Sequence, residues 1–89
     1  GKTLIGKNCI INNGSIIEHN CKIGNHTHIA PGVKIAGNVS VGENCMIGIG
    51  SIVKNGVKIG KNVVIGAGSV ITKNLSPNKT YIKYSELLK

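Results

Sequence analysis

The sequence predicts an all-β fold, a left-handed parallel β-helix built from hexapeptide repeats and shaped as a triangular prism. An Ile or Val recurs at every sixth position, and three residues after each of them comes a residue that tolerates left-handed backbone. Ile-Gly or Val-Gly pairs also recur every eighteen residues, beginning at Ile5, Ile23, Val41 and Ile59. A period of six inside a period of eighteen indicates three sides per coil.

Two columns of residues are expected to point into the prism, because side chains two residues apart share one face of a strand. The aliphatic column is Ile5, Ile11, Ile17, Ile23, Ile29, Ile35, Val41, Ile47, Val53, Ile59, Ile65 and Ile71. The second column, two residues earlier, is Thr3, Cys9, Ser15, Cys21, Thr27, Val33, Val39, Cys45, Ser51, Val57, Val63 and Ser69. All three cysteines fall in this small column, so they are read as reduced packing residues and no disulfide is expected.

The corners are predicted from a third column, whose members favour positive φ. These residues are Asn8, Gly14, Asn20, His26, Gly32, Asn38, Asn44, Gly50, Gly56, Asn62, Gly68 and Asn74. His26 is the single member that is neither Asn nor Gly, and we interpret it as a turn residue because His also accepts this conformation. Each hexapeptide is thus one short strand and one corner.

The residue before each inward aliphatic should face outward. The first side carries Ile10, His28, Met46 and Val64, the second carries Ile16, Lys34, Ile52 and Val70, and the third carries Lys22, Ser40, Lys58 and Ser76. Two sides therefore have apolar stripes and one is polar. Such a surface predicts a homotrimer in which two sides of each prism meet neighbours.

The β-helix is expected to span residues 1–76, and residues 77–89 to form a C-terminal capping tail in which 85–88 could make a short helical turn. The first coil has no comparable cap, which suggests that N-terminal sequence is missing.

Composition narrows the function classes. The net charge is +8, but Tyr81 and Tyr84 are the only aromatic residues, which argues against a nucleic-acid partner. No apolar run reaches the roughly 18 residues of a membrane span, so a cytoplasmic protein without membrane association is expected. An odd number of cysteines without a C-x-x-C pair argues against a disulfide framework or a zinc site.

Two histidines are candidates for chemistry. His19 lies at a corner, where an imidazole could accept a proton near neutral pH, although an ordinary surface histidine is an equal alternative. His28 lies on an outward stripe and is either an interface residue or a donor that orients a ligand.

A family resemblance is carried by five segments of the chain. They are His19-Asn20-Cys21-Lys22-Ile23-Gly24, His28-Ile29-Ala30-Pro31-Gly32, Gly37-Asn38-Val39, Ile47-Gly48-Ile49-Gly50-Ser51 and Ile65-Gly66-Ala67-Gly68-Ser69-Val70. The stretch from about Ile16 to Ser69 resembles the hexapeptide acyltransferases that acetylate sialic acid hydroxyls or the amino group of nucleotide-linked amino sugars. The resemblance implies an acetyl-CoA-dependent acetyltransferase acting on a sugar, with no metal.

The resemblance also implies roles for individual residues. His19 matches the catalytic base, and the backbone N–H of Gly37 matches the group that steadies the oxyanion. Asn20 stands where the family usually has an acidic residue, so it can orient the imidazole but adds no charge. His28, Ile49 and Ala67 match positions that contact acetyl-CoA in a groove between adjacent subunits.

Tyr81-Ile82-Lys83-Tyr84 does not match the family's Gly-x-Pro-Ala-Lys segment, so the resemblance implies no role for this tail in CoA binding. The family's N-terminal domain, which holds the sugar in some members, is absent, and this leaves the acceptor and O- versus N-transfer open. Two alternatives are a γ-type carbonic anhydrase and a non-catalytic trimeric scaffold. The former needs three zinc-binding histidines across a subunit boundary, and His19, His26 and His28 span only half a coil.

Overall fold

The computed structural model describes residues 1–82, which form a parallel β-helix of two-residue strands and contain no helix. Each strand is one inward aliphatic residue and its outward neighbour. The strands are β1 (Leu4–Ile5), β2 (Ile10–Ile11), β3 (Ile16–Ile17), β4 (Lys22–Ile23), β5 (His28–Ile29), β6 (Lys34–Ile35), β7 (Ser40–Val41), β8 (Met46–Ile47), β9 (Ile52–Val53), β10 (Lys58–Ile59), β11 (Val64–Ile65), β12 (Val70–Ile71) and β13 (Thr80–Tyr81).

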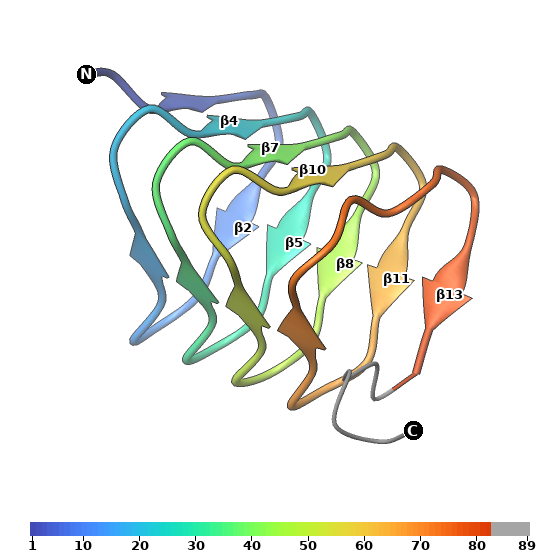
Figure 1. The fold of residues 1–89 in the computed structure, drawn as a ribbon. Coiled ribbons are helices and arrows are strands. Elements are labelled where there is room, and N and C mark those ends of the chain that lie inside the picture. The colour runs from blue at the N-terminus through green and yellow to red at the C-terminus, as the bar shows by residue number, and fades with distance from the viewer. Residues whose placement is uncertain (83–89) are drawn as a thin grey trace.

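Three parallel sheets make the sides of the prism (Figure 1). We name them sheet A (β1-β4-β7-β10), sheet B (β2-β5-β8-β11-β13) and sheet C (β3-β6-β9-β12). Their register follows the eighteen-residue period, as in Ile5↔Ile23, Ile11↔Ile29 and Ile17↔Ile35. The chain passes from A to B to C, clockwise in Figure 1 as it advances toward the viewer, which is a left-handed turn. The predicted fold is confirmed.

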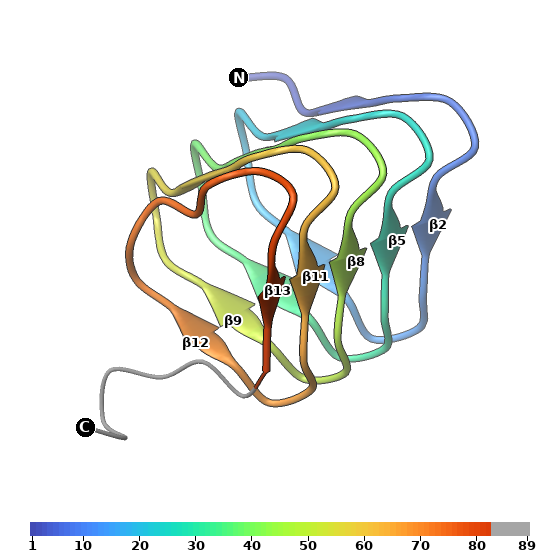
Figure 2. The same ribbon diagram turned by 90° about the vertical axis from the view of Figure 1, so that its right-hand side faces the viewer.

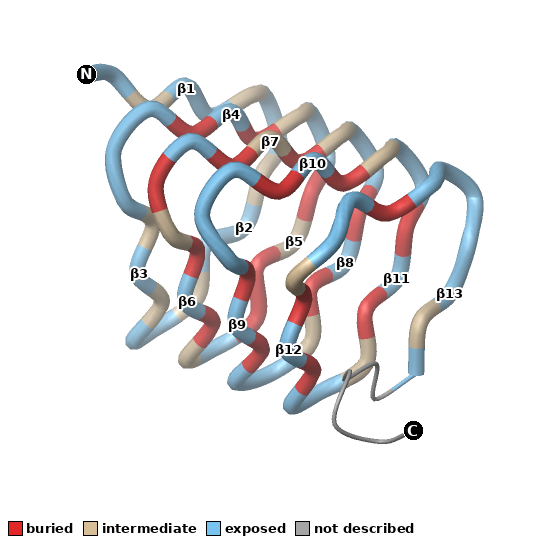
Figure 3. Tube along the Cα trace, viewed as in Figure 1, coloured by how far each residue is buried: buried red, intermediate tan, exposed pale blue. Residues whose placement is uncertain are grey.

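The core is the predicted aliphatic column (Figure 3). Its members from Ile23 to Ile71 are at most 3% exposed, whereas Ile5 and Ile11 in the first coil are 49% and 38% exposed. The difference arises because, within residues 1–82, a coil needs neighbours on both sides to bury its interior and the first coil has only one.

The small column does more than fill space. The side chains of Cys9, Cys21, Thr27, Cys45 and Ser51 each donate a hydrogen bond to the carbonyl fifteen residues later, at 2.9–3.2 Å. These carbonyls lie at corners of the next coil, where backbone pairing between strands stops. The column therefore satisfies buried acceptors while linking consecutive coils.

The corners have the predicted left-handed residues, including His26 at φ 59°. A second requirement appears at the corner after sheet A, where the chain stacks closely on itself. A Cβ added at Gly42 would lie 2.6 Å from the backbone N of Lys61. Only glycine fits there, which explains the Ile-Gly and Val-Gly pairs that mark each coil.

The repeat ends differently from expectation. Asn74 is not in the left-handed region, and Leu75 rather than residue 77 pairs with Ile59, because the corner after β12 is two residues shorter than the others. The hexapeptide then resumes with Asn78 at φ 64° and Tyr81 paired with Ile65.

Figure 2 shows the consequence, with β13 beside β11 on sheet B. The repeat geometry therefore extends through β13, past residue 76, where the sequence pattern predicts the end of the β-helix. Asn74, not Ser76, neighbours Lys58, and its Oδ1 accepts a hydrogen bond from the Lys58 N–H at 2.8 Å. The proposed helical turn at 85–88 lies outside the described residues.

The outward stripes are present on the two expected sheets. Ile10, Met46 and Val64 on sheet B are 54%, 41% and 41% exposed. Ile16, Ile52 and Val70 on sheet C are 46%, 45% and 38% exposed. Sheet A presents the exposed Lys22 and Lys58 with the half-buried Ser40 between them. Each prism thus has two apolar sides and one polar side.

Candidate active site

His19 lies at the corner between sheets C and A, directly after β3, and its side chain is exposed. Its ring leans toward the next coil, onto the Cα of Gly37. A Cβ built on Gly37 would lie 3.0 Å from His19 Cε1 and 3.1 Å from Nε2. Two of the three expected catalytic residues, eighteen positions apart, are therefore in contact.

The backbone beneath this pair is held by coil-to-coil hydrogen bonds. The Asn38 N–H donates to the His19 carbonyl at 3.0 Å, and the Gly56 N–H donates to the Gly37 carbonyl at 3.1 Å. Within residues 1–82 no hydrogen bond uses the Gly37 N–H. Gly37 is buried, and its N–H is left without a partner in this part of the chain, as an oxyanion donor is before substrate binds.

Asn55 completes the column and was not anticipated from the sequence. It lies one coil beyond Gly37, and its Nδ2 is 3.3 Å from the same built Cβ position that the His19 ring approaches. The signal that could have found it is simple counting, because residues eighteen apart stack and Asn55 is two such steps from His19.

Asn20, the third expected catalytic residue, is arranged differently. It takes the left-handed position of the turn at φ 59°, and its side chain lies against Gly1, one coil before. The His19 ring leans the opposite way, toward the following coil. The hydrogen bonds of residues 1–82 include none between Asn20 and that ring.

Two of the expected acetyl-CoA residues meet at another corner. Ile49 and Ala67 stack in successive coils between sheets B and C, where the Gly68 N–H donates to the Ile49 carbonyl at 2.8 Å. Both side chains are exposed, Ile49 by 60%. They form a small apolar surface at the edge of the prism.

His28 faces outward on β5 in sheet B and is half-buried. Its Nε2 is 3.0 Å from Asn12 Nδ2, at the start of the same corner one coil before. With Nε2 accepting from the amide, the proton of a neutral ring is on Nδ1. This hydrogen bond fixes the ring beside the corner that carries Ile49 and Ala67.

The two groups of residues lie at opposite edges of sheet C. His19 and Gly37 follow its strands, whereas Ile49 and Ala67 precede them. A single chain therefore does not bring the expected base and the expected acetyl-CoA contacts together.

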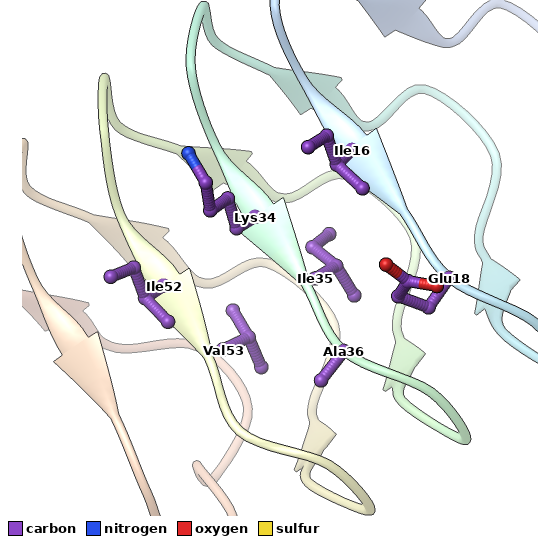
Figure 4. A pocket seen from close by; sticks show the side chains of 7 residues that line it. All are labelled: Ile16, Glu18, Lys34, Ile35, Ala36, Ile52 and Val53. Atoms are coloured by element: carbon purple, nitrogen blue, oxygen red, sulfur yellow. The ribbon is translucent and has the colours of Figure 1, made fainter.

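A shallow open depression of about 310 Å³ lies on sheet C beside the His19 corner. It is lined by Ile16, Glu18, Lys34, Ile35, Ala36, Ile52 and Val53. Figure 4 shows the Lys34 ammonium pointing away from the Glu18 carboxylate, which faces the space beside Ala36. The depression thus has one carboxylate, that of Glu18, which precedes His19 in the sequence.

His26 and Cys45 have partners in neighbouring coils. His26 Nδ1 is 3.3 Å from Asn8 Nδ2 in the neighbouring corner. Burial raises the pKa of the Cys45 thiol, against the opposing effect of the backbone hydrogen bonds with Val63 and Asn62. In residues 1–82, His, Cys, Asp and Glu side chains form no group of three that could hold a metal ion.

The part of the chain that the structure describes has no helix long and apolar enough to cross a membrane.

Stacked coils of six-residue repeats place the chain among the hexapeptide-repeat proteins. The sequence matches the family described as bacterial transferase hexapeptide (six repeats) at residues 2–37 and 38–73, and the chain belongs to this family.

Solved structures with this fold include several acetyltransferases. A maltose O-acetyltransferase from Clostridium difficile 630 is 35% identical with a TM-score of 0.84, the match covering 88% of this chain and 52% of that one. A GDP-perosamine N-acetyltransferase from Caulobacter crescentus is also 35% identical with a TM-score of 0.84, the match covering 88% of this chain and 37% of that one. That structure is of a variant in which a histidine is replaced by alanine, in complex with CoA and GDP-perosamine.

The acetyltransferase domain of PglB from Neisseria gonorrhoeae FA1090, in complex with acetyl coenzyme A, is 28% identical with a TM-score of 0.79. That match covers 88% of this chain and 41% of the other. This chain therefore spans about half, or less, of the length of these acetyltransferases.

Proposed function

We propose that this chain catalyses transfer of an acetyl group from acetyl-CoA to a hydroxyl or amino group of a sugar. The observation that carries the proposal is the contact between the His19 ring and Gly37, whose N–H makes no hydrogen bond within residues 1–82. The similar structures support the donor and the acceptor class, since one was solved with acetyl coenzyme A and another with CoA and GDP-perosamine. Whether the acceptor is a sialic acid, a nucleotide-linked amino sugar or another sugar is a question for the assay.

His19 acts as the general base in this proposal. Its imidazole removes the proton from the acceptor hydroxyl or amine as that group attacks the thioester carbonyl. The Gly37 N–H donates to the oxyanion that forms, which collapses with expulsion of the CoA thiolate. The proton held by His19 then passes to the thiolate, so free CoA leaves as a thiol and the base is restored.

We further propose that a homotrimer completes the site. Ile49 and Ala67 lie at the far edge of sheet C from His19, and His28 lies on the adjoining sheet B, so in the proposed assembly an acetyl-CoA that contacts them meets the His19 of a neighbouring subunit. The exposed apolar stripes of sheets B and C supply surfaces for that contact. In such an assembly the acyl donor lies in the groove between two prisms.

The test is release of the CoA thiol in the presence of acetyl-CoA and a panel of acceptors that includes maltose, GDP-perosamine and sialic acid. Sugar-dependent release should fall about a hundredfold or more in His19→Ala, as is typical when a general base is removed. His26→Asn is the matched control, because Asn accepts the left-handed turn that His26 occupies and should keep full activity.

Acetyl-CoA binding, followed by calorimetry, separates the remaining outcomes. Binding without turnover on any acceptor would contradict the catalytic assignment on this panel. Absence of both binding and turnover would favour the alternative of a trimeric scaffold.

A further inference from the structure

We propose that Asn55 is an acceptor-binding residue, and that the exposed ends of the His19 and Asn55 side chains, which converge over Gly37, together contact the reacting sugar and form its subsite. This inference rests on the proposed acetyl transfer and adds the residue that positions the acceptor for it. The three residues form one column at the corner between sheets C and A, in successive coils.

The geometry defines a single point shared by two polar side chains. The position that a Gly37 Cβ would take is 3.1 Å from His19 Nε2 and 3.3 Å from Asn55 Nδ2. These side chains come from opposite directions, His19 from the coil before Gly37 and Asn55 from the coil after. The imidazole and the carboxamide therefore converge over Gly37, and a ligand at this corner can contact both of them.

Backbone conformation does not account for the glycine at this position. The left-handed residue of the turn is Asn38 at φ 61°, and Gly37 is not among the residues with positive φ. Crowding by neighbouring backbone does not account for it either. A Cβ at Gly42 would meet main-chain atoms at 2.6–2.8 Å, whereas at Gly37 it would meet only the ends of two side chains. The missing side chain allows the His19 ring and the Asn55 carboxamide to approach each other over Gly37.

The chemistry of Asn55 suits a sugar. A carboxamide offers two N–H donors and a carbonyl acceptor, so it can bind a hydroxyl next to the reacting group in either hydrogen-bonding sense. Among hydrogen bonds of residues 1–82, none uses the Asn55 side chain. Other corner asparagines do have such partners, for example Asn25 Oδ1, which accepts from the Lys7 N–H at 2.8 Å. The exposed carboxamide of Asn55 therefore has no partner in this part of the chain, unlike that of Asn25.

The experiment compares steady-state acetyl transfer by wild type, Asn55→Ala and Asn55→Gln, with Asn13→Ala as the control. Asn13 is an exposed asparagine in the equivalent turn position of another corner. Loss of one hydrogen bond to the acceptor should raise its KM about tenfold in Asn55→Ala and leave the KM for acetyl-CoA unchanged. Asn55→Gln should recover part of the loss, and Asn13→Ala should match wild type.

A second readout does not depend on turnover. The ¹H and ¹³C resonances of the His19 ring are followed while maltose, GDP-perosamine or sialic acid is added. A bound acceptor should shift them in wild type and not in Asn55→Ala.

The possible results separate this inference from the proposed function. If acetyl transfer requires His19 but the acceptor KM is unchanged in Asn55→Ala, the proposed subsite is overturned. The proposed acetyltransferase function is then still supported. If acceptors shift the His19 ring resonances in an Asn55-dependent way but no acetyl transfer occurs, the subsite is supported and the proposed enzymatic function is overturned. Neither transfer nor shifts with any acceptor overturns both.

Discussion

The imidazole of His19 packs onto the Cα of Gly37, eighteen residues further along the chain, so closely that a methyl group at position 37 would lie 3.0 Å from Cε1. The contact spans two coils, and the hydrogen bond from the Asn38 N–H to the His19 carbonyl holds those coils in register. A base and a backbone donor are thereby set side by side by the coil spacing alone.

Gly37→Ala should impair catalysis without unfolding the protein. The added methyl would displace the His19 ring and crowd the Asn55 carboxamide. Both neighbours are exposed side chains that can move away, so the change in the free energy of unfolding should stay within about 0.5 kcal/mol. We expect acetyl transfer to fall at least tenfold, measured by CoA thiol release. Wild-type rates in a folded Gly37→Ala protein would contradict the assigned role.

Gly42→Ala should do the reverse and destabilise the fold. Its Cβ would lie 2.6 Å from the Lys61 N and 2.8 Å from the Gly60 carbonyl carbon, which are main-chain atoms that cannot move without disturbing the next coil. Overpacking of this kind costs about 1–3 kcal/mol. Urea unfolding measures this loss in the free energy of unfolding, with Gly37→Ala as the glycine-to-alanine control. Equal stability of the two variants would refute the explanation for the repeated glycines.

Burial along the aliphatic column should set the cost of truncation. Ile47 is fully buried, so Ile47→Ala should lower the free energy of unfolding by about 2–5 kcal/mol. Ile5 occupies the same column but is 49% exposed, and Ile5→Ala should cost well under half as much. Chemical denaturation of both variants tests the difference. Similar losses would mean that Ile5 is covered in solution.

Stability should fall at alkaline pH partly through Cys45. Burial raises the pKa of this thiol above its ordinary value of 9.0, so the unfolded chain loses this proton at lower pH than the folded chain does. The folded state then binds more protons, and the free energy of unfolding decreases as the pH rises above about 9.

The comparison that isolates this effect is wild type against Cys45→Ser at about pH 7 and pH 10. A serine hydroxyl can keep the hydrogen bond that Cys45 donates to the Gly60 carbonyl, but it does not titrate in this range. The alkaline loss should therefore be smaller in Cys45→Ser. An identical loss in both proteins would assign it to other groups.

The proposed trimer should depend on the apolar stripe of sheet C. Ile52 faces outward there, and Ile52→Lys would place a charge in a contact between subunits. We expect sedimentation velocity to show a trimer for wild type and a shift to monomer for the variant. Ser40→Lys on the polar sheet A is the control and should remain trimeric. A monomeric wild type would remove the proposed groove between subunits.

The sequence by itself determined the coil, because each hexapeptide makes a strand and a corner by local preferences and the same side chains recur at the same places. The inward Ile29, the buried Cys21 and the left-handed turn at His26 could all be predicted by counting. The pairing of His19 with Gly37 also follows from the eighteen-residue period.

Only the tertiary structure decided what happens where residues depart from the repeat. The short corner after β12, which moves Leu75 into the core and resumes the repeat at Asn78, depends on how the last coil closes on the one before. Likewise, the convergence of His19 and Asn55 above Gly37, and the turn of Asn20 toward Gly1, depend on side-chain directions at exposed corners. Periodicity places the Cα atoms of a corner, but packing against adjacent coils chooses the direction of its side chains.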